Sequence, residues 1–154
     1  MSVRLVAVTR ENLRALCKLD AGDGGLQVAP NVMSMAQAAV HPEAWPRAIE
    51  ADGRLVGFVM LYDPSLAPPE HPPEQPHFYV WRFMIDREHQ RSGLGRAAMQ
   101  RVIEHVRARP GVDRLMLSYV PPAEHLARFY GSFGFESTGE VDDGELVMSL
   151  RLDR

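Results

Sequence analysis

The spacing of apolar residues changes repeatedly along this chain, and each change marks a predicted element. Short apolar runs bounded by turn residues predict strands over Val3–Val8, Arg47–Ala51, Leu55–Tyr62, Phe78–Ile85, Leu115–Val120, Phe135–Val141 and Leu146–Leu152. Apolar residues three and four apart predict helices over Thr9–Leu19, from Ser34 to before Pro46, over Leu94–Arg109 and around Leu126–Phe133. This order of elements predicts an α/β (α+β) fold, in which helices cover the faces of a mixed sheet.

Turn-forming residues place the connections between these elements. Asp52-Gly53 and Asp142-Asp143-Gly144 predict two hairpins. The segment Asp20–Pro30 contains three glycines and is predicted to be a loop. The segment Asp63–His77 contains six prolines, which exclude a regular helix or strand and predict a long, stiffened loop.

Composition narrows the class of protein. A chain of 154 residues, 45% of them hydrophobic and 24% charged, is typical of a globular protein, and we expect a single domain over 1–154. No apolar run is long enough to cross a membrane and no secretory pattern follows Met1, so we expect neither a membrane span nor secretion. The single cysteine, Cys17, excludes an intrachain disulfide and predicts a reducing, hence cytoplasmic, compartment.

Charge is distributed unevenly along the chain. The net charge of −3 argues against a general nucleic-acid binder. Seven arginines lie within Arg82–Arg109 against three acidic residues, whereas Leu19–Pro46 and Leu55–Trp81 together contain six acidic residues and no lysine or arginine. This pattern predicts that one end of the molecule suits an anion and another a cation. The six histidines do not fall at metal-ligand spacing with cysteine or carboxylate partners, so we expect no metal site.

The stretch that carries most chemistry is Gln90-Arg91-Ser92-Gly93-Leu94-Gly95-Arg96, between a predicted strand and a predicted helix. Closely spaced glycines at a helix N-terminus leave backbone N–H groups open to a phosphate. A Walker A loop is excluded because Gly-Lys-Ser/Thr is absent. A dinucleotide fingerprint fits Gly93–Ala98, but seven polar residues separate it from its strand, and Asp113 precedes the next strand instead of following it. A loop of pattern Q/R-x-x-G-x-G/A for the pyrophosphate of acetyl-CoA fits without a gap, and a plain strand-to-helix turn stays open.

Two segments, Gln90–Gly95 and Phe129-Tyr130-Gly131-Ser132-Phe133-Gly134-Phe135, together resemble the GNAT N-acetyltransferase superfamily. Further segments are similar to bacterial spermine/spermidine N-acetyltransferases, namely Val28–Asn31, Ser34–Ala38, Pro42–Pro46, Val56–Met60 and Trp81–Asp86. The resemblance implies a mostly antiparallel sheet of about seven strands, whose central pair splays apart around the donor, acetyl-CoA. It also implies transfer of an acetyl group to a primary amine, such as that of a polyamine, and a homodimer.

The resemblance implies roles for particular residues. The backbone of Phe83, Met84 and Ile85 would hydrogen-bond the pantetheine arm, and the N–H of Ile85 would polarise the thioester carbonyl. By its place in Phe129–Phe135, Tyr130 matches the general acid of the family, and a phenol with a pKa of about 10 suits protonation of a leaving thiolate. Packing of Tyr130 in its helix is the alternative. The pyrophosphate would be held by Gln90, Arg91, Ser92, Gly93, Leu94, Gly95 and Arg96.

Two positions depart from the family pattern. Tyr79 stands where many members carry a glutamate used as a base, and Ala123 stands where an asparagine is common. Deprotonation of the amine through a water chain, or through a carboxylate such as Glu43, stays open. Other cationic amines as acceptors, and a non-catalytic acyl-CoA-binding module, are the alternative functions. The residues predicted to bind a cationic acceptor are Asp20, Glu43, Tyr79 and Trp81, with Asp23, Glu70 and Glu74 as further carboxylates.

Overall fold

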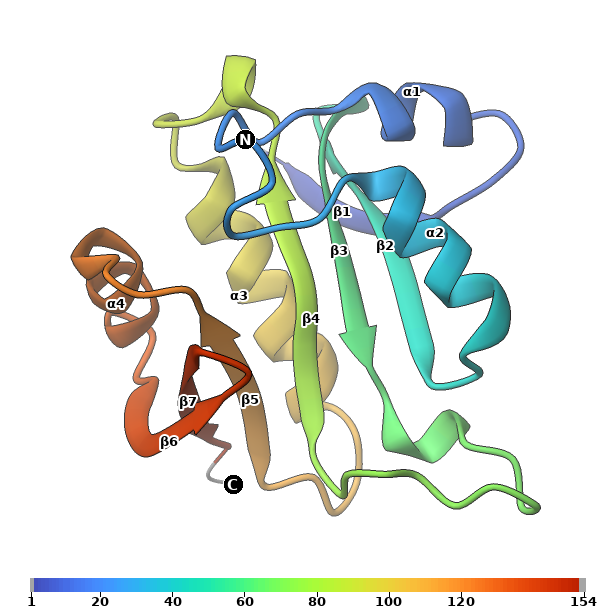
Figure 1. The fold of residues 1–154 in the computed structure, drawn as a ribbon. Coiled ribbons are helices and arrows are strands. Elements are labelled where there is room, and N and C mark those ends of the chain that lie inside the picture. The colour runs from blue at the N-terminus through green and yellow to red at the C-terminus, as the bar shows by residue number, and fades with distance from the viewer. Residues whose placement is uncertain (1, 153–154) are drawn as a thin grey trace.

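Seven strands form one sheet in the computed structural model, which describes residues 2–152 (Figure 1). The order across the sheet is β1-β2-β3-β4-β5-β7-β6, and every neighbouring pair is antiparallel except β4 and β5. The strands are β1 Val3–Ala7, β2 Ala44–Ala51, β3 Arg54–Tyr62, β4 Phe78–Ile85, β5 Arg114–Tyr119, β6 Glu136–Asp142 and β7 Glu145–Arg151. The predicted mixed, mostly antiparallel sheet is therefore confirmed.

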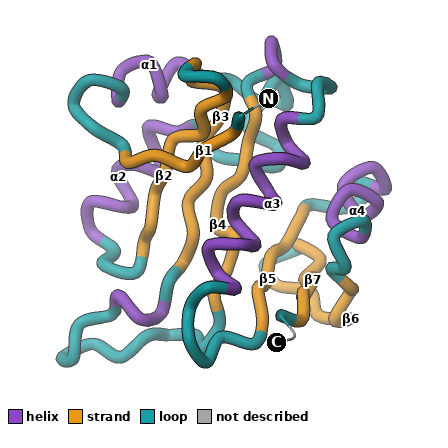
Figure 2. The backbone as a smooth tube through the Cα atoms, turned by 180° about the vertical axis from the view of Figure 1, so that it is seen from behind, coloured by secondary structure: helices purple, strands orange, loops and turns teal. Residues whose placement is uncertain are grey.

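Helices cover both faces of this sheet, as the sequence predicts. The four helices of the described residues are α1 Leu13–Lys18, α2 Asn31–Val40, α3 Leu94–Arg107 and α4 Glu124–Gly131. The helices α1 and α2 lie on one face, and α3 lies on the other (Figures 1 and 2). Two short 3₁₀ turns, η1 Pro64–Leu66 and η2 Arg87–His89, interrupt the loops before and after β4.

The apolar face of α3 anchors the larger of two core layers. Ala98, Met99 and Val102 are fully buried, as the helical spacing predicts, and they pack with residues of β3, β4 and β5. A second, smaller layer under α1 and α2 contains Leu16 and Phe58. Each fully buried large side chain contributes about 1.5–3 kcal/mol. The sheet is thus fixed from both sides.

The central strands β4 and β5 separate soon after they meet. They pair only through Phe78 with Leu115 and Tyr79 with Met116. The pairing of β4 with β3 also shifts register, so that Trp81 is an extra residue in β4. A bulge of this kind bends its strand and increases the local twist. The splayed central pair implied by the family resemblance is therefore present.

The starts of the first two helices differ from the sequence-based expectation. The first helix begins at Leu13 and not after Thr9, because Thr9 and Asn12 exchange hydrogen bonds in a separate turn. The second helix begins at Asn31, next to Pro30, whose fixed φ is compatible with a helix start. Ser34, expected as the N-cap, is fully buried inside α2.

The strand β2 is longer than predicted and includes a proline. It begins at Ala44 instead of Arg47, and Pro46 lies opposite Met60 of β3. The neighbouring strand β1 ends at Ala7, opposite Arg47, so one edge of β2 is unpaired at Pro46. A proline is tolerated at such an edge because no backbone N–H is needed there.

Candidate active site

A cleft of about 680 Å³ lies where β4 and β5 separate. Its walls come from β4, β5, α4, the loop between α1 and α2, and the turn before α3. Side chains from all five segments line it, among them Trp81, Arg91, Ser118, Leu126 and Tyr130. The gap in the sheet, which removes strand partners from both edges, is the reason that a cleft exists in the middle of a packed domain.

The backbone of β4 offers hydrogen-bonding groups to this cleft at alternate residues. The Asp86 N–H donates to Val56 of β3 at 2.8 Å. The Met84 carbonyl faces Gly57 of β3, where a Cβ would collide with it. Neighbouring residues in a strand direct these groups to opposite edges. The backbone groups of Phe83 and Ile85 therefore face the cleft, whereas those of Met84, also predicted to contact pantetheine, face β3.

The turn before α3 has the geometry of an anion site. Arg91 and Gly93 adopt left-handed conformations, with φ of 63° and 83°, and Gly93 is the N-cap of α3. The first helical bond runs from the Ala97 N–H to the Gly93 carbonyl at 3.1 Å, so the preceding amides have no acceptor within the helix. Free amides and the positive end of the helix dipole favour a phosphate here.

Side chains of this turn are held by specific contacts. Gln90 Nε2 donates to the Ile85 carbonyl at 2.8 Å and to the Ala21 carbonyl at 2.9 Å. Ser92 Oγ donates to the His89 carbonyl at 2.7 Å. Arg96 reaches α4 instead of the turn, because its Nη2 donates to Ser132 Oγ at 2.7 Å. Among the predicted pyrophosphate residues, Gln90 is thus a structural bridge, and the guanidinium of Arg96 is engaged elsewhere.

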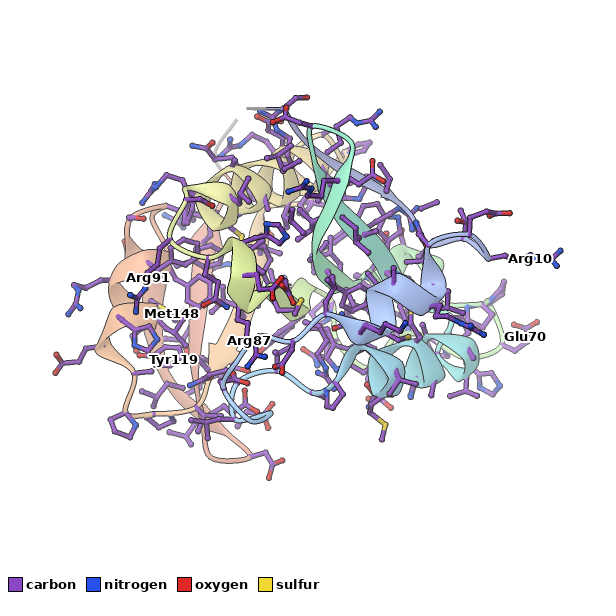
Figure 3. The ribbon with its side chains drawn as sticks, turned by 90° about the horizontal axis from the view of Figure 1, so that it is seen from above. Arg10, Glu70, Arg87, Arg91, Tyr119 and Met148 are labelled. Carbon is purple, nitrogen blue, oxygen red and sulfur yellow. The ribbon has the colours of Figure 1, made fainter. Side chains whose placement is uncertain are left out.

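Arg91 is the arginine of the turn that lines the cleft. Its side chain lies on the same side of the molecule as Tyr119, another residue of the cleft wall, and away from Arg10 and Glu70 (Figure 3). Arg91 is exposed, so its charge is available to an entering phosphate.

Tyr130 lines the cleft from α4 and is 9% exposed. Its ring contacts Phe129 and Phe135 edge-on, with centroids 5.3 and 6.0 Å apart. Burial raises the pKa of its hydroxyl to about 12, so the phenol keeps its proton at neutral pH. Tyr130 thus packs in its helix and also lines the cleft, and its role as general acid stays a prediction.

Comparison with known proteins decides the family. The model of the Acetyltransferase (GNAT) family matches residues 14–135. The chain belongs to this family. It is therefore an acetyl-CoA-dependent N-acetyltransferase.

Two curated relatives resemble this acetyltransferase along its whole length. They are a probable spermine N(1)-acetyltransferase of Bacillus subtilis subsp. natto (strain BEST195) and a spermine/spermidine N(1)-acetyltransferase of Bacillus subtilis (strain 168). Each is 31% identical over 158 residues, which cover 99% of this chain and 100% of the relative.

Solved structures of other acetyltransferases share the fold. An aminoglycoside acetyltransferase in complex with coenzyme A matches with a TM-score of 0.76 and 18% identity, over 97% of this chain and 95% of that one. A spermidine N-acetyltransferase from Vibrio cholerae, in complex with CoA and spermine, matches with a TM-score of 0.74 and 16% identity, over the same shares, 97% and 95%.

The predicted acceptor residues of the acetyltransferase do not form one group. Trp81 lines the cleft, and its ring lies 5.5 Å from that of His41. Asp20 does not line the cleft. Its carboxylate accepts a hydrogen bond from the Gly22 N–H at 2.8 Å. Glu43 lines a separate cavity of about 420 Å³ under the proline-rich loop, together with Glu74. Of the carboxylates expected at one mouth, Asp23 lines the cleft, Glu43 and Glu74 line the other cavity, and Asp20 lines neither.

Tyr79 has acidic neighbours that sequence reasoning missed. Burial raises the pKa of its hydroxyl, and the carboxylates of Asp142 and Glu140 raise it further. Glu145, at the start of β7, accepts a hydrogen bond at 2.9 Å from Ser118, which lines the cleft. A signal was present, because four acidic residues lie within Glu140–Glu145 without a basic one. From the sequence alone, this stretch predicts only a hairpin turn.

Residues 2–152 contain no group of three or more histidine, cysteine or acidic side chains placed to hold a metal ion. No helix among them has the length and apolar character that a membrane crossing requires.

Proposed function

We propose that this acetyltransferase transfers the acetyl group of acetyl-CoA to a primary amine of a polyamine such as spermidine or spermine. The observation that carries the proposal is the acidic hairpin of β6 and β7, whose Glu145 accepts a hydrogen bond at 2.9 Å from Ser118 of the cleft wall. Burial raises the pKa of the nearby Tyr79 hydroxyl, and Asp142 and Glu140 of the same hairpin raise it further. Grouped carboxylates near a partly desolvated surface attract a multiply charged cation. The two Bacillus relatives, named for spermine and spermidine, support the same acceptor class.

The donor is held by the backbone in this proposal. Acetyl-CoA supplies an activated acetyl group in the form of a thioester. The amides before and within the first turn of α3 receive its pyrophosphate, and Arg91 adds a charge at the cleft wall. The cleft-facing N–H of Ile85 is a donor fixed by the sheet, so stabilising a developing oxyanion requires no reorganisation there.

Tyr130 is the proposed general acid. An alkylammonium with a pKa of about 10 has to lose its proton before it attacks a thioester. The leaving thiolate then takes a proton, and Tyr130 is a protonated phenol in the cleft wall. The base that deprotonates the amine stays undecided between a water chain and a carboxylate.

An acceptor panel tests the proposal. Purified protein is mixed with acetyl-CoA and with spermidine, spermine, an aminoglycoside or a lysine peptide, and free thiol is measured. We expect kcat/KM to be highest for the polyamines and the polyamine KM to rise with ionic strength. A preference for the aminoglycoside or the peptide would refute the polyamine acceptor, and binding of acetyl-CoA without turnover would indicate a non-catalytic module.

A charge-neutralising variant tests the acidic hairpin directly. Glu140→Gln combined with Asp142→Asn removes two charges near Tyr79 and is expected to raise the spermine KM about tenfold, with kcat changed less. Glu11→Gln, at an exposed position before α1, is the matched control and should leave the KM unchanged. An unchanged spermine KM in the double variant would contradict the assignment of the hairpin.

A further inference from the structure

The loop between α1 and α2 crosses the cleft and is tied down on both sides of it. We name residues Ala21–Val28 the cleft strap. In Figure 1 this loop passes in front of β4. On the β4 side, Gln90 Nε2 holds both the Ala21 carbonyl and the Ile85 carbonyl, at 2.9 and 2.8 Å. Residues of the strap line the cleft opposite α4.

On the β5 side, the side chain of Gln27 makes two hydrogen bonds to the backbone of Val120. Gln27 Nε2 donates to the Val120 carbonyl at 2.7 Å, and the Val120 N–H donates to Gln27 Oε1 at 2.8 Å. The primary amide thus meets both backbone groups of Val120, as a neighbouring strand would. Val120 follows β5 and leads through Pro121 and Pro122 into α4, the helix that carries Tyr130.

The strap itself is held in one shape by its own contacts. Asp23 accepts hydrogen bonds from the N–H groups of Gly25 at 2.9 Å and Gln27 at 3.0 Å. Gly22, Gly24 and Gly25 adopt left-handed conformations with φ between 67° and 83°, which other residues adopt only with strain. Because the conformation of the cleft strap is fixed by these contacts, its position over the cleft depends on the hydrogen bonds of Gln90 and Gln27 at its two ends.

We propose that Gln27 is a positioning residue of this acetyltransferase, whose side-chain amide holds the cleft strap against β5 and thereby closes this side of the cleft during the reaction. This inference rests on the proposed function, because it assumes that acetyl transfer takes place in the cleft. A closed strap gives the amine a fixed wall to bind against and keeps water from the thioester. Water that reaches the thioester adds to its carbonyl carbon and breaks the C–S bond, which yields acetate and the thiol of CoA.

The test compares Gln27→Ala and Gln27→Glu with wild type. The glutamate keeps the volume and the bond from the Val120 N–H, but its carboxylate has no proton to donate to the Val120 carbonyl. In Gln27→Ala we expect faster hydrogen exchange at the Val120 amide, and in Gln27→Glu we expect the carboxylate to repel the Val120 carbonyl. In both variants we expect the amine KM to rise about tenfold and more CoA to be released per acetylated amine, while kcat at saturating amine stays within about threefold of wild type. Gln100→Ala, on the exposed surface of α3, is the control and should match wild type in each measurement.

These measurements distinguish a positioning role of Gln27 in the reaction from a contribution to stability alone. A melting temperature lowered without a change in amine KM or in the ratio of CoA released to amine acetylated would overturn the proposal. Unchanged exchange at Val120 in Gln27→Ala would also overturn it, because the clamp would then be absent in solution. If Gln27→Ala does not fold, Gln27→Glu supplies the kinetic answer. A wild type that acetylates other amines but no polyamine would refute the proposed acceptor alone, and the comparison would be made with the amine that is accepted.

Discussion

Replacing Tyr130 by phenylalanine separates catalysis from packing in this acetyltransferase. The hydroxyl makes no hydrogen bond to the described residues, so its removal leaves no partner unsatisfied and should change the free energy of unfolding by less than about 1 kcal/mol. The ring, 9% exposed and in contact with Phe129 and Phe135, is retained. Loss of a general acid lowers turnover about 10²- to 10⁴-fold. Tyr130→Phe is therefore expected to be folded and nearly inactive.

The assay needs three measurements on the same preparation. Thiol release under saturating substrates gives kcat, titration calorimetry gives the dissociation constant of CoA, and thermal unfolding gives stability. Tyr119→Phe removes another phenol of the cleft wall and should keep kcat within about threefold. Tyr130→Ala removes the ring as well and should cost about 3–5 kcal/mol of stability. A Tyr130→Phe enzyme with wild-type kcat would refute the general-acid role and leave Tyr130 as a core residue.

Three further predictions concern the anion turn, a histidine and a buried carboxylate. Gly93→Ala places a Cβ at φ 83° before α3 and should weaken CoA binding about tenfold, as measured by calorimetry. Gly111→Ala, at φ 76° after α3, carries the same strain of about 1–2 kcal/mol and should leave CoA binding intact. Equal CoA affinities of the two variants would contradict the anion site. Burial lowers the pKa of His105, so the folded state favours the neutral ring and loses stability as the pH falls below about 6.5. The melting temperature of wild type relative to that of His105→Phe should therefore decrease from pH 7.5 to 5.5. Melting temperatures of the two proteins that change in parallel with pH would contradict this. Asp63 is fully buried and accepts hydrogen bonds from Arg109 Nη1 at 3.2 Å and from the N–H and hydroxyl of Ser65 at 2.9 and 2.6 Å. Because the Arg109 side chain is 35% exposed and stays solvated when the Asp63 carboxylate is removed, Asp63→Ala should lower the free energy of unfolding by about 1–3 kcal/mol in chemical denaturation, and an unchanged unfolding curve would show that these bonds contribute little.

The glycine turn is the part of the site that could be predicted from the sequence alone. The left-handed φ at Gly93 is predictable from the residue type, because glycine adopts a positive φ without the strain that other residues incur. The buried face of α3 was predictable for a similar reason, since helical spacing places Ala98, Met99 and Val102 on one side. Local rules of this kind need no knowledge of distant segments.

Contacts between distant segments were not predictable. Gln27 meets Val120 across 93 positions, and nothing in either residue type marks the other as its partner. The sequence groups Glu43 with Asp20, because both lie in an acidic stretch. In the fold, Glu43 lines the cavity under the proline-rich loop, whereas Asp20 accepts a hydrogen bond from Gly22 in the loop before α2. The start of α2 was also misplaced, because the helix begins directly after Pro30, at Asn31, and this puts Ser34 inside the helix and not at its N-cap.

The order of strands and helices and the left-handed glycine turn before α3 were thus determined by the sequence, since each depends on the periodicity or conformational preference of neighbouring residues. The tertiary structure alone decided which carboxylates gather beside β4, which backbone groups of β4 face the cleft, and how the loop before α2 spans the gap. Those features depend on where β4 and β5 separate, and that separation results from packing on both faces of the sheet together with the extra residue at Trp81.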